Sequence, residues 1–268
     1  MKKQNLKRHF DWKYTLVYGF LVLVNILPLI TEKPYQPQNT QDVILNLLMV
    51  AIVPYQAYGP IFHAVTLLII FTILWMPGRM GRLLAGYIGI DYLIIAAAQT
   101  MGQTEKYGFV VQLGALVNLV IFGIAWLFVA FRNDIKPAFK KPTLPEYGLI
   151  VLALLAFWGP YTLTDGTIQP NFNPLLLLTS PDYGLTFCFT TPVFLLGLIL
   201  IYPHVNDFAY RITAFSGLLY GLFNPSHWFN PATQWMGFLH LPLLIISIYA
   251  LLLRGWNRQL HRVELQEP

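Results

Sequence analysis

Tyr14-Thr15-Leu16 begins an apolar stretch that ends in Thr31-Glu32-Lys33-Pro34-Tyr35-Gln36-Pro37, and Tyr147-Gly148-Leu149 begins a second that ends in Thr164-Asp165-Gly166-Thr167-Ile168-Gln169-Pro170. One offset of 133 residues relates the two stretches, from Tyr14 to Tyr147 and from Gln36 to Gln169. Because polar positions match as well as apolar ones, the pattern indicates an internal repeat. Duplicated membrane units commonly form their working site where the two copies meet.

The composition places the chain among membrane proteins. Of its 268 residues, 56% are hydrophobic and only 11% are charged, and the mean hydropathy is +0.55. Soluble domains carry about a quarter charged residues. We therefore expect an all-α, polytopic membrane helix bundle in which residues 1–268 form a single integral membrane domain.

Apolar runs long enough to cross roughly 30 Å of hydrocarbon, at about 1.5 Å per residue, recur along the chain. They predict eight transmembrane helices, at residues 14–30, 58–76, 83–100, 108–131, 147–164, 184–202, 212–223 and 235–253. The seventh run is short, and we expect its helix to continue through Pro225 toward Phe229.

Lysines and arginines test this topology, because they accumulate in short cytoplasmic loops. Fifteen of the 17 fall on one side of the eight-helix arrangement, and only Lys33 and Lys106 fall on the other. Both termini are therefore predicted to be cytoplasmic, in a multi-pass protein of the cytoplasmic (inner) membrane. The net charge of +5 follows from this topology and does not indicate a nucleic-acid partner.

The repeat extends beyond the opening stretches. Tyr58-Gly59 matches Tyr183-Gly184 at an offset of 125 residues, and Arg82 matches Arg211 at 129. We place repeat one at residues 13–132 and repeat two at 146–258. Four helices in each copy give both copies the same orientation, related by an axis along the membrane normal. The alternative is a coincidence of helix composition.

Candidate ligand-binding residues follow from the repeat. Thr, a carboxylate and Gln offer oxygen ligands and hydrogen-bond donors, and the Pro after the Gln stiffens the chain. Two such elements facing each other would bind a cation or a polar solute through Glu32, Gln36, Asp165, Gln169, Tyr58 and Tyr183. The alternative is structural: the threonines end helices, the acids mark the membrane boundary, and Gln-Pro makes a turn.

The segments between the predicted spans on the outer side are apolar themselves. Residues 43–53 are too short for a further span, so we expect them to lie in the interface or to re-enter, and residues 175–178 hold the corresponding place in repeat two. The outer side carries more carboxylates than lysines. This excess disfavours an anionic ligand and tolerates a cationic or neutral one.

Asp91 is the only carboxylate within a predicted span. It lies nine residues from Arg82, which corresponds to roughly 13 Å at about 1.5 Å per residue and places it close to the membrane midplane. Acids at that depth are costly and are functional candidates by default. Asp91 is either a proton relay or ion ligand, or a hydrogen-bonded acid that joins helices.

His63 and His240 are predicted to lie at the same depth. That placement fits a bis-histidine haem or a metal, and it equally fits two histidines at the membrane interface. The single cysteine, Cys188, allows no intramolecular disulfide and is interpreted as a packing residue. The sequence carries none of the common hydrolase, nucleotide-binding or CxxC motifs, so we expect no cofactor unless the histidines hold one.

Phe187-Cys188-Phe189-Thr190-Thr191-Pro192-Val193-Phe194, continued by Leu195-Leu196-Gly197-Leu198, resembles a family of uncharacterised prokaryotic multi-pass membrane proteins, in which a Cys-x-Thr-Thr-type segment opens a similar helix. The resemblance covers this helix and the general spacing of the spans, and this chain departs from the pattern by the Phe before the cysteine. It implies a bacterial or archaeal cytoplasmic membrane and no particular activity.

Three functions stay open at this point. The sequence favours a transporter or channel-like protein that binds a small cationic or neutral solute between the repeats. A membrane enzyme acting on a lipid or isoprenoid would use Asp165, His63 or His240 as acid-base groups. A non-catalytic subunit or sensor would present an apolar patch, without a cavity, to a membrane-protein partner. The expected partners are the lipid bilayer, a solute or lipid, and a second membrane protein or copy of the chain.

Overall fold

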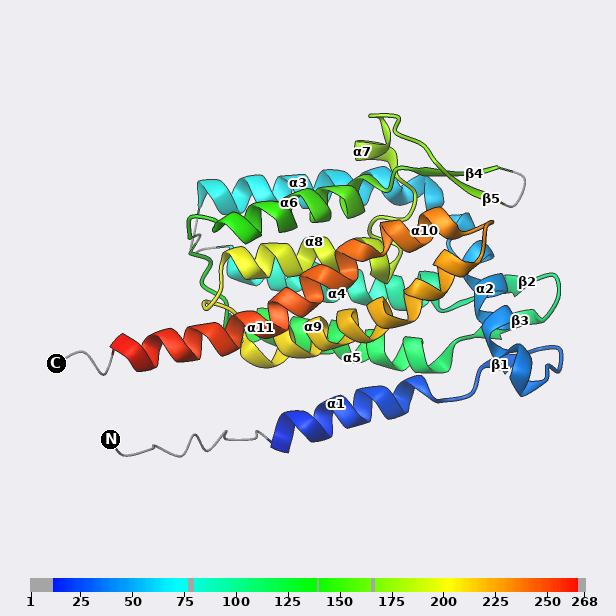
Figure 1. Cartoon of the computed structure of the whole chain (residues 1–268), viewed down its shortest axis with the longest axis horizontal. Coiled ribbons are helices and arrows are strands. Elements are labelled where there is room, and N and C mark those ends of the chain that lie inside the picture. The colour runs from blue at the N-terminus through cyan, green and yellow to red at the C-terminus, as the bar shows by residue number, and fades with distance from the viewer. Residues whose placement is uncertain (1–11, 77–79, 139, 165–166, 265–268) are drawn as a thin grey trace.

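The computed structural model describes residues 12–76, 80–138, 140–164 and 167–264. These residues are mostly helical, as predicted, and the longest helices run roughly along the long axis of the molecule (Figure 1). In order they are α1 (Trp12–Asn25), α3 (Gly59–Trp75), α4 (Gly81–Gln99), α5 (Leu113–Arg132), α6 (Leu144–Trp158), α8 (Phe187–Leu200), α9 (Asp207–Phe223) and α11 (Leu241–Glu264), the last preceded by the short α10 (Gln234–Leu239).

Four helical stretches in the described residues are long and apolar enough to cross a membrane. They are Pro37–Trp75, α4, α5 and Gln234–Leu253. The helices α6 and α8 are apolar but shorter. Large apolar side chains also lie exposed along the bundle, among them Phe20, Leu68, Trp75, Phe131, Val151 and Leu252. The chain therefore has the character of a membrane protein.

Strands occur where the sequence predicted helix ends. β2 (Met101–Thr104) and β3 (Gly108–Val111) form a hairpin that β1 (Ile30–Thr31) joins through β3, and β4 (Tyr161–Thr164) pairs with β5 (Thr167–Pro170). The first residues of the predicted fourth span and the last of the fifth are thus extended. In the sequence, their apolar side chains look like a continuation of the neighbouring helix. In the structure, Gly108 has a φ of 68° and Gly159 a φ of 54°, and residues in this left-handed conformation interrupt a helix.

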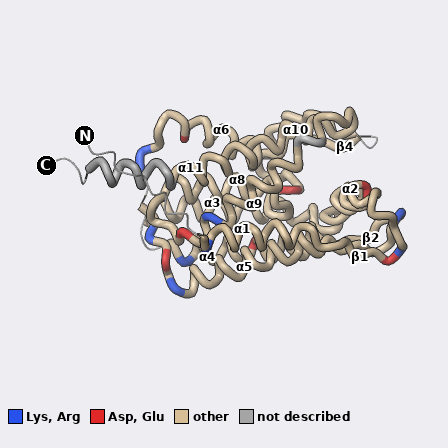
Figure 2. Tube along the Cα trace, turned by 60° about the horizontal axis from the view of Figure 1, so that its bottom comes forward, with Lys and Arg blue, Asp and Glu red and all other residues tan. Residues whose placement is uncertain are grey.

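Both hairpins lie at one end of the bundle, opposite the end where α1 begins and α11 finishes (Figure 1). We call these the hairpin end and the terminal end. Most described lysines and arginines gather at the terminal end, whereas Lys33 and Lys106 lie at the hairpin end (Figure 2). This distribution is the one that the sequence analysis assigned to the two sides of a membrane.

Polar residues at the terminal end define where two helices begin. Thr143 and Glu146 form a capping box at the start of α6, with the Thr143 N–H donating to Glu146 Oε2 at 2.8 Å. Lys140 Nζ pairs with the buried Glu146 Oε1 at 2.7 Å. Asn206 caps α9 by accepting from the Ala209 N–H at 3.0 Å. This cap explains why α9 begins five residues before the predicted 212: its first turn carries the charged Asp207 and lies outside the predicted apolar run.

The apolar segments of the hairpin end are also ordered. α2 (Thr40–Val50) packs on the β2–β3 hairpin through the buried side chains Val43, Leu47, Ala51, Tyr107 and Val110. The 3-10 helix η2 (Val53–Tyr58) then leads directly into α3. α7 (Leu176–Thr179) follows β5, and the 3-10 helix η3 (Asn224–Phe229) continues α9 as predicted. Segments expected to lie in the interface or to re-enter thus pack on protein.

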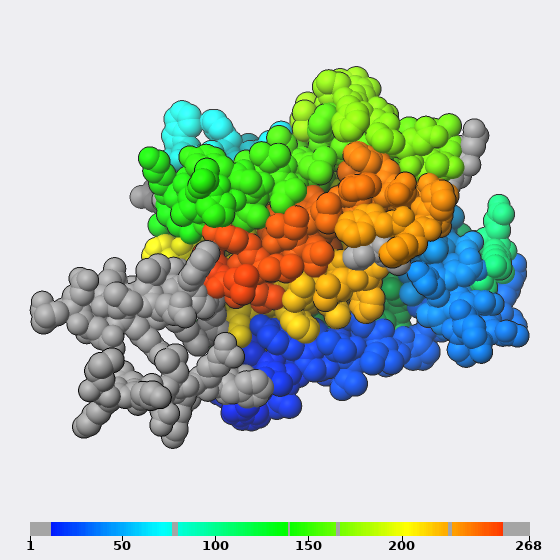
Figure 3. Space-filling view, viewed as in Figure 1, coloured from blue at the N-terminus to red at the C-terminus, as the bar shows by residue number. Residues whose placement is uncertain are grey.

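The core lies between the two parts of the chain, which we call the first half (residues 12–132) and the second half (144–264). Tyr92 of α4 packs edge-on against Phe122 of α5 and Phe194 of α8, at centroid distances of 5.9 and 5.7 Å. α1 lies along α5 and α9 and forms one edge of the face shown in Figure 3. Side chains from both halves therefore share one apolar core.

Candidate functional site

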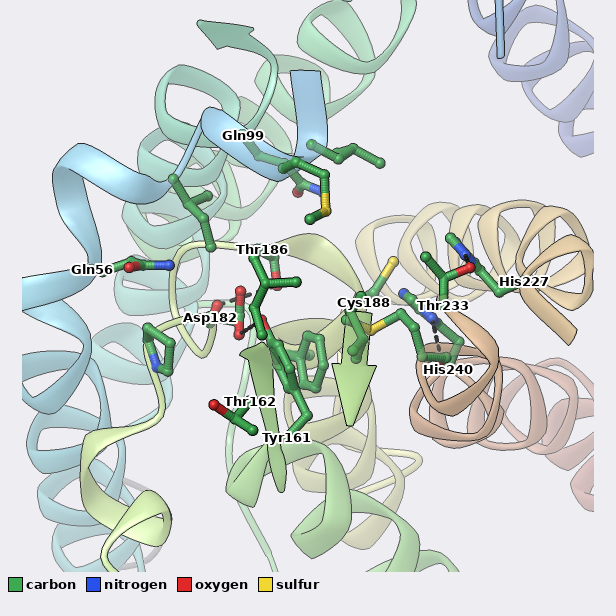
Figure 4. Close-up of a pocket in the computed structure, with 18 of the residues that line it drawn as sticks. Gln56, Gln99, Tyr161, Thr162, Asp182, Thr186, Cys188, His227, Thr233 and His240 are labelled. Carbon is green, nitrogen blue, oxygen red and sulfur yellow. Dashed lines mark hydrogen bonds between the residues drawn. The ribbon is translucent and has the colours of Figure 1, made fainter. Parts of the chain in front are cut away.

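A cavity of about 470 Å³ lies at the hairpin end between the two halves of the chain. Its volume is within the range of small-molecule sites. The first half contributes α2, η2 and the end of α4, and the second half contributes β4, β5, α8, η3 and α10 (Figure 4). The sequence predicted a site where two repeats meet. The cavity lies between the two halves of the chain, and most of the side chains that line it are not those the sequence singled out.

The cavity is largely apolar with a few polar groups. Apolar side chains along the wall include Leu48, Met49, Ile52, Ile168, Phe189 and Met236. The polar ones include Gln56, Gln99, Tyr161, Asp182, Thr186, His227 and His240. In Figure 4, Asp182 and Tyr161 lie between Gln56 and Gln99 on one side and Cys188, His227 and His240 on the other. Such a wall suits a small molecule with an apolar body and one polar or charged group.

Asp182 is the carboxylate of the cavity. It is buried, and its Oδ2 accepts a hydrogen bond from the Tyr161 hydroxyl. Its backbone carbonyl accepts from the N–H groups of Leu185 and Thr186, at 3.0 and 2.8 Å. These bonds hold the segment before α8 in a tight turn, so the carboxyl group has a fixed position in the cavity wall.

Burial raises the pKa of the Asp182 carboxyl from 3.8 to about 6, and the hydrogen bond from Tyr161 offsets part of this rise. Removal from water disfavours the charged form, whereas the phenol hydroxyl favours it. At neutral pH Asp182 is mostly ionised and carries a buried negative charge. A cation in the cavity would be stabilised by this charge.

Two histidines form the far wall. The rings of His227 and His240 stack with a centroid distance of 5.6 Å and an angle of 7° between their planes. His227 Nδ1 lies 3.1 Å from Thr233 Oγ1, and His240 Nδ1 lies 2.7 Å from the Met236 carbonyl. Burial lowers the pKa of His227. A neutral histidine near the cavity adds hydrogen-bonding capacity without adding positive charge.

Contacts at and near the cavity wall also join the two halves. Gln99 at the end of α4 accepts from the Phe187 N–H at 2.8 Å, where α8 begins. Gly59 lies directly against Ser180, where a Cβ would meet the Ser180 carbonyl. These contacts fix the position of α3 and α4 relative to α8.

A buried network of hydroxyls lies deeper between the halves. Thr66 Oγ1 lies 2.7 Å from the Tyr87 hydroxyl and 2.9 Å from the Tyr183 hydroxyl. The Tyr92 hydroxyl lies 3.1 Å from Thr191 Oγ1. Further along, Trp126 Nε1 donates to Thr213 Oγ1 at 3.0 Å. Each of these bonds except Thr66 to Tyr87 joins the first half to the second.

Asp91 lies beside this network. It is fully buried on α4, and neither carboxylate oxygen has a hydrogen-bond partner among the described residues. Asp91 and Tyr183, two of the predicted site residues, do not line the cavity.

The other predicted ligand residues lie elsewhere. Four of them have exposed side chains that do not line the cavity: Glu32, Gln36, Tyr58 and Gln169. Asp165 lies outside the described residues. Glu32 accepts from the Phe109 N–H at 2.8 Å, which lowers its pKa and ties β1 to β3. The hydrogen bond that Glu32 makes therefore has a structural role, because it joins two strands.

His63 and His240 occupy different surroundings. His240 lines the cavity beside His227, whereas His63 packs between Phe157 and Tyr183, at centroid distances of 4.4 and 4.8 Å. His63 Nε2–H donates to the Ser180 carbonyl at 3.3 Å. Within the described part of the chain, no group of three or more metal-binding side chains is brought together.

Asp182, Tyr161 and His227 were missed as site residues by the sequence reasoning. Asp182 was counted only among the outer charges, and Tyr161 only as part of an apolar run. A signal was present, because Asp182 immediately precedes Tyr183, which the repeat had selected. Its burial depends on the β4–β5 hairpin folding over it, which no periodicity indicates.

Comparisons of the chain with protein-family models, with characterised proteins and with solved structures found no match.

Proposed function

We propose that this chain is a transporter or channel-like membrane protein that binds a small cationic or neutral solute in the cavity between its halves. The observation that carries the proposal is Asp182, a buried carboxylate in a largely apolar cavity to which both halves contribute. Many transporters built from two similar units bind their solute at the junction of these units.

The charge of the site favours this solute class. Asp182 is mostly ionised at neutral pH, and the described hairpin end carries Glu32, Asp42 and Glu105 against only Lys33 and Lys106. Asp42 and Lys106 pair with each other at 2.7 Å. An anion would therefore meet negative charge both on approach and at the site.

The proposed topology has eight membrane spans and both termini in the cytoplasm of a prokaryotic cell. Support comes from the eight helices that coincide with the eight apolar runs within the described residues and from the basic side chains at the terminal end (Figure 2). The shorter helices α1, α6 and α8 fit a membrane if the bilayer thins locally or the helices lie against protein.

Duplication of a four-helix unit is supported by the order of the elements. In each half a long helix leads to one or two strands, a short helix and two long helices, and a final long helix ends the half. Within the described residues, only the first half has a hairpin, β2–β3, directly before its final long helix. The halves differ in strand pairing, because β1 pairs with β3 whereas β4 pairs with β5. We propose that the copies have diverged most at the hairpin end, where the cavity lies.

Three ligands of similar shape but different charge test the proposal. They are the cation choline, the uncharged 3,3-dimethylbutanol, in which carbon replaces the nitrogen of choline, and the anion 3,3-dimethylbutyrate. Each would be titrated into the purified protein in nanodiscs, with binding measured calorimetrically. We expect choline to bind more tightly than the alcohol and the anion not to bind.

Asp182→Asn should abolish the preference for choline over the alcohol. Asp134→Asn is the matched control, because Asp134 lies at the terminal end, where it contacts Arg132 at 3.4 Å and Asn206 at 3.2 Å. Preferential binding of the anion, or an unchanged preference in Asp182→Asn, would contradict the proposal.

A membrane-embedded enzyme acting on a lipid or isoprenoid is the second candidate. His240, one of the acid-base groups predicted for that function, lines the cavity beside His227, Cys188 and Asp182. Imidazole, thiol and carboxyl groups can each donate or accept a proton in catalysis. Turnover of added lipid that disappears in His240→Ala would establish this reading in place of transport. The third candidate, a non-catalytic subunit or sensor, was predicted to have no cavity. The presence of the cavity therefore counts against it.

A further inference from the structure

Asp182 keeps one oxygen open in the wall of the cavity. Its side chain is only 4% exposed, and its Oδ2 already accepts from the Tyr161 hydroxyl. Its Oδ1 accepts no hydrogen bond from a described residue and is not enclosed by protein. None of the described residues that line the cavity is a lysine, an arginine or a second acid. A cationic group of the solute is the partner that suits this oxygen.

His240 keeps a lone pair open at another part of the same wall. Its Nδ1 lies 2.7 Å from the Met236 carbonyl oxygen, and a carbonyl oxygen can only accept a hydrogen bond. Nδ1 therefore carries the proton, and in the neutral ring Nε2 is an acceptor. Nε2 has no partner among the described residues and is not enclosed by protein. The second ring nitrogen of His240 can therefore accept a hydrogen bond from a solute.

Several other polar groups of the wall already have partners. Thr186 Oγ1 donates to the Asp182 carbonyl oxygen at 3.2 Å. His227 Nδ1 and Thr233 Oγ1 lie 3.1 Å apart and satisfy each other. The Asp182 carboxylate and the His240 ring differ from these groups, because each keeps an acceptor open to the cavity.

A row of aromatic rings extends between these two acceptors. The Tyr161 ring, whose hydroxyl contacts Asp182, stacks on Phe189 with a centroid distance of 6.1 Å and an angle of 27° between the planes. The Phe189 ring in turn lies 6.1 Å from that of His240. In Figure 4, Asp182 and His240 lie apart in the cavity, with Cys188 drawn between them. Aromatic faces attract cations and pack against apolar groups, so a solute can extend along this row.

We propose that the solute of this cavity is an ammonium ion that carries a hydroxyl group at the far end of an apolar linker. The ammonium group lies against Asp182, the linker lies along Tyr161 and Phe189, and the hydroxyl group donates to His240 Nε2. The single carboxylate favours one cationic centre, and the neutral ring of His240 favours a donor without charge. This solute class rests on the proposed solute-binding function and adds to it the requirement for a donor.

Pairs of ammonium ions that differ only at the far end test this requirement. Each pair consists of choline, or a longer hydroxyalkyl homologue, and the ion in which a methyl group replaces the hydroxyl group. For choline that partner is propyltrimethylammonium. Calorimetry on the native protein in nanodiscs compares their affinities at about pH 8, where histidine side chains are ordinarily neutral.

The native protein should prefer the hydroxyl-bearing ion of the pair whose length matches the distance between the two acceptors. We expect it to bind about tenfold more tightly than its methyl partner, because the methyl group leaves a buried acceptor unpaired. Pairs that are too short or too long should show little preference, so the series also measures how far His240 lies from the ammonium site.

His240→Phe tests which residue accepts the hydrogen bond. The variant keeps a ring to pack on Phe189 but removes the acceptor, so it should bind both members of the pair equally. His204→Phe is the matched control, because His204 is exposed between α8 and α9 and does not line the cavity. It should keep the tenfold preference. Asp182→Asn should weaken the binding of both ions.

Equal binding within every pair, or a preference that persists in His240→Phe, would overturn this inference. If the ammonium ions then still bind more tightly than 3,3-dimethylbutanol, the solute site at Asp182 stands without the contact at His240. If no ammonium ion binds, the proposed function is overturned together with this inference.

Discussion

The Tyr161 hydroxyl donates a hydrogen bond to Asp182 Oδ2 and so joins the β4–β5 hairpin to the segment that precedes α8. The two residues lie 21 positions apart, on opposite sides of α7. Their bond holds the hairpin against the cavity and gives the carboxylate its one side-chain donor in the described structure. Cavity shape and cavity charge therefore depend on the same pair.

Tyr161→Phe should weaken cation binding at pH values near 6. The substitution removes the hydrogen bond that lowers the pKa of Asp182, so the carboxyl titrates at a higher pH and is less ionised near 6. We expect a loss of about 1 to 3 kcal/mol in unfolding free energy as well, because a buried hydrogen bond is broken. Choline calorimetry between pH 5 and pH 8, roughly the range in which such carboxyls titrate, measures the shift. An unchanged pH profile would show that the bond does not control the charge.

Asp182→Asn should stabilise the protein at neutral pH. Because the folded-state pKa of about 6 exceeds the ordinary 3.8, the native state binds more protons than the unfolded state between these values. Stability of the native protein therefore falls as pH rises through this window and then levels off. The variant lacks this fall, so it should be more stable above the window by about 1 to 3 kcal/mol.

Urea unfolding of both proteins at the two ends of the window measures this difference. Parallel pH dependence in Asp182→Asn and the native protein would show that another group titrates there. Asp134→Asn serves again as the control, and we expect its stability to depend on pH as that of the native protein does.

Much of the helical fold was open to prediction from the sequence, because long apolar runs favour helices. Within the described residues, a long helix overlaps each of the eight predicted runs, and the Pro-containing continuation of α9 was expected. The hairpins were not, because Phe109-Val110-Val111 is as apolar as a helix start and nothing local shows that Gly108 adopts a positive φ. Pairing with distant β1 decides the conformation there.

The site was less accessible to sequence reasoning. Of the predicted site residues, His240 lines the cavity, whereas Asp91 and Tyr183 do not. Asp182 lies in a loop and His227 in the short 3-10 helix η3, where polar residues are ordinary, and only the folded structure shows that they face a cavity. The predicted repeat matches residues of the spans, so it could not locate side chains of the connecting segments.

Gly184→Ala should destabilise the junction of α3 and α8. Gly184 has a φ of 79°, and a Cβ there would overlap with the Phe62 ring. We expect a loss of about 2 to 4 kcal/mol from strain and steric overlap together. Gly197→Ala in α8 is the matched control, because nothing lies within 4 Å of a Cβ there, and it should be neutral or stabilising. Thermal unfolding in detergent compares the two; equal midpoints would contradict this packing.

Cysteine labelling tests the proposed topology. In a Cys188→Ala background, Lys106→Cys in the hairpin turn should react with a membrane-impermeant maleimide in intact cells. Lys136→Cys, between α5 and α6, should react only after the membrane is opened, because the positive residues gather on the cytoplasmic side. Labelling of both from the same side would exclude the eight-span arrangement.

Native mass spectrometry of the protein released from gentle detergent tests the central claim most directly. The claim predicts a small neutral or cationic molecule bound to the native protein and to Asp134→Asn, and lost from Asp182→Asn. A molecule that stays bound in Asp182→Asn, or an anionic one, would contradict a solute site at Asp182.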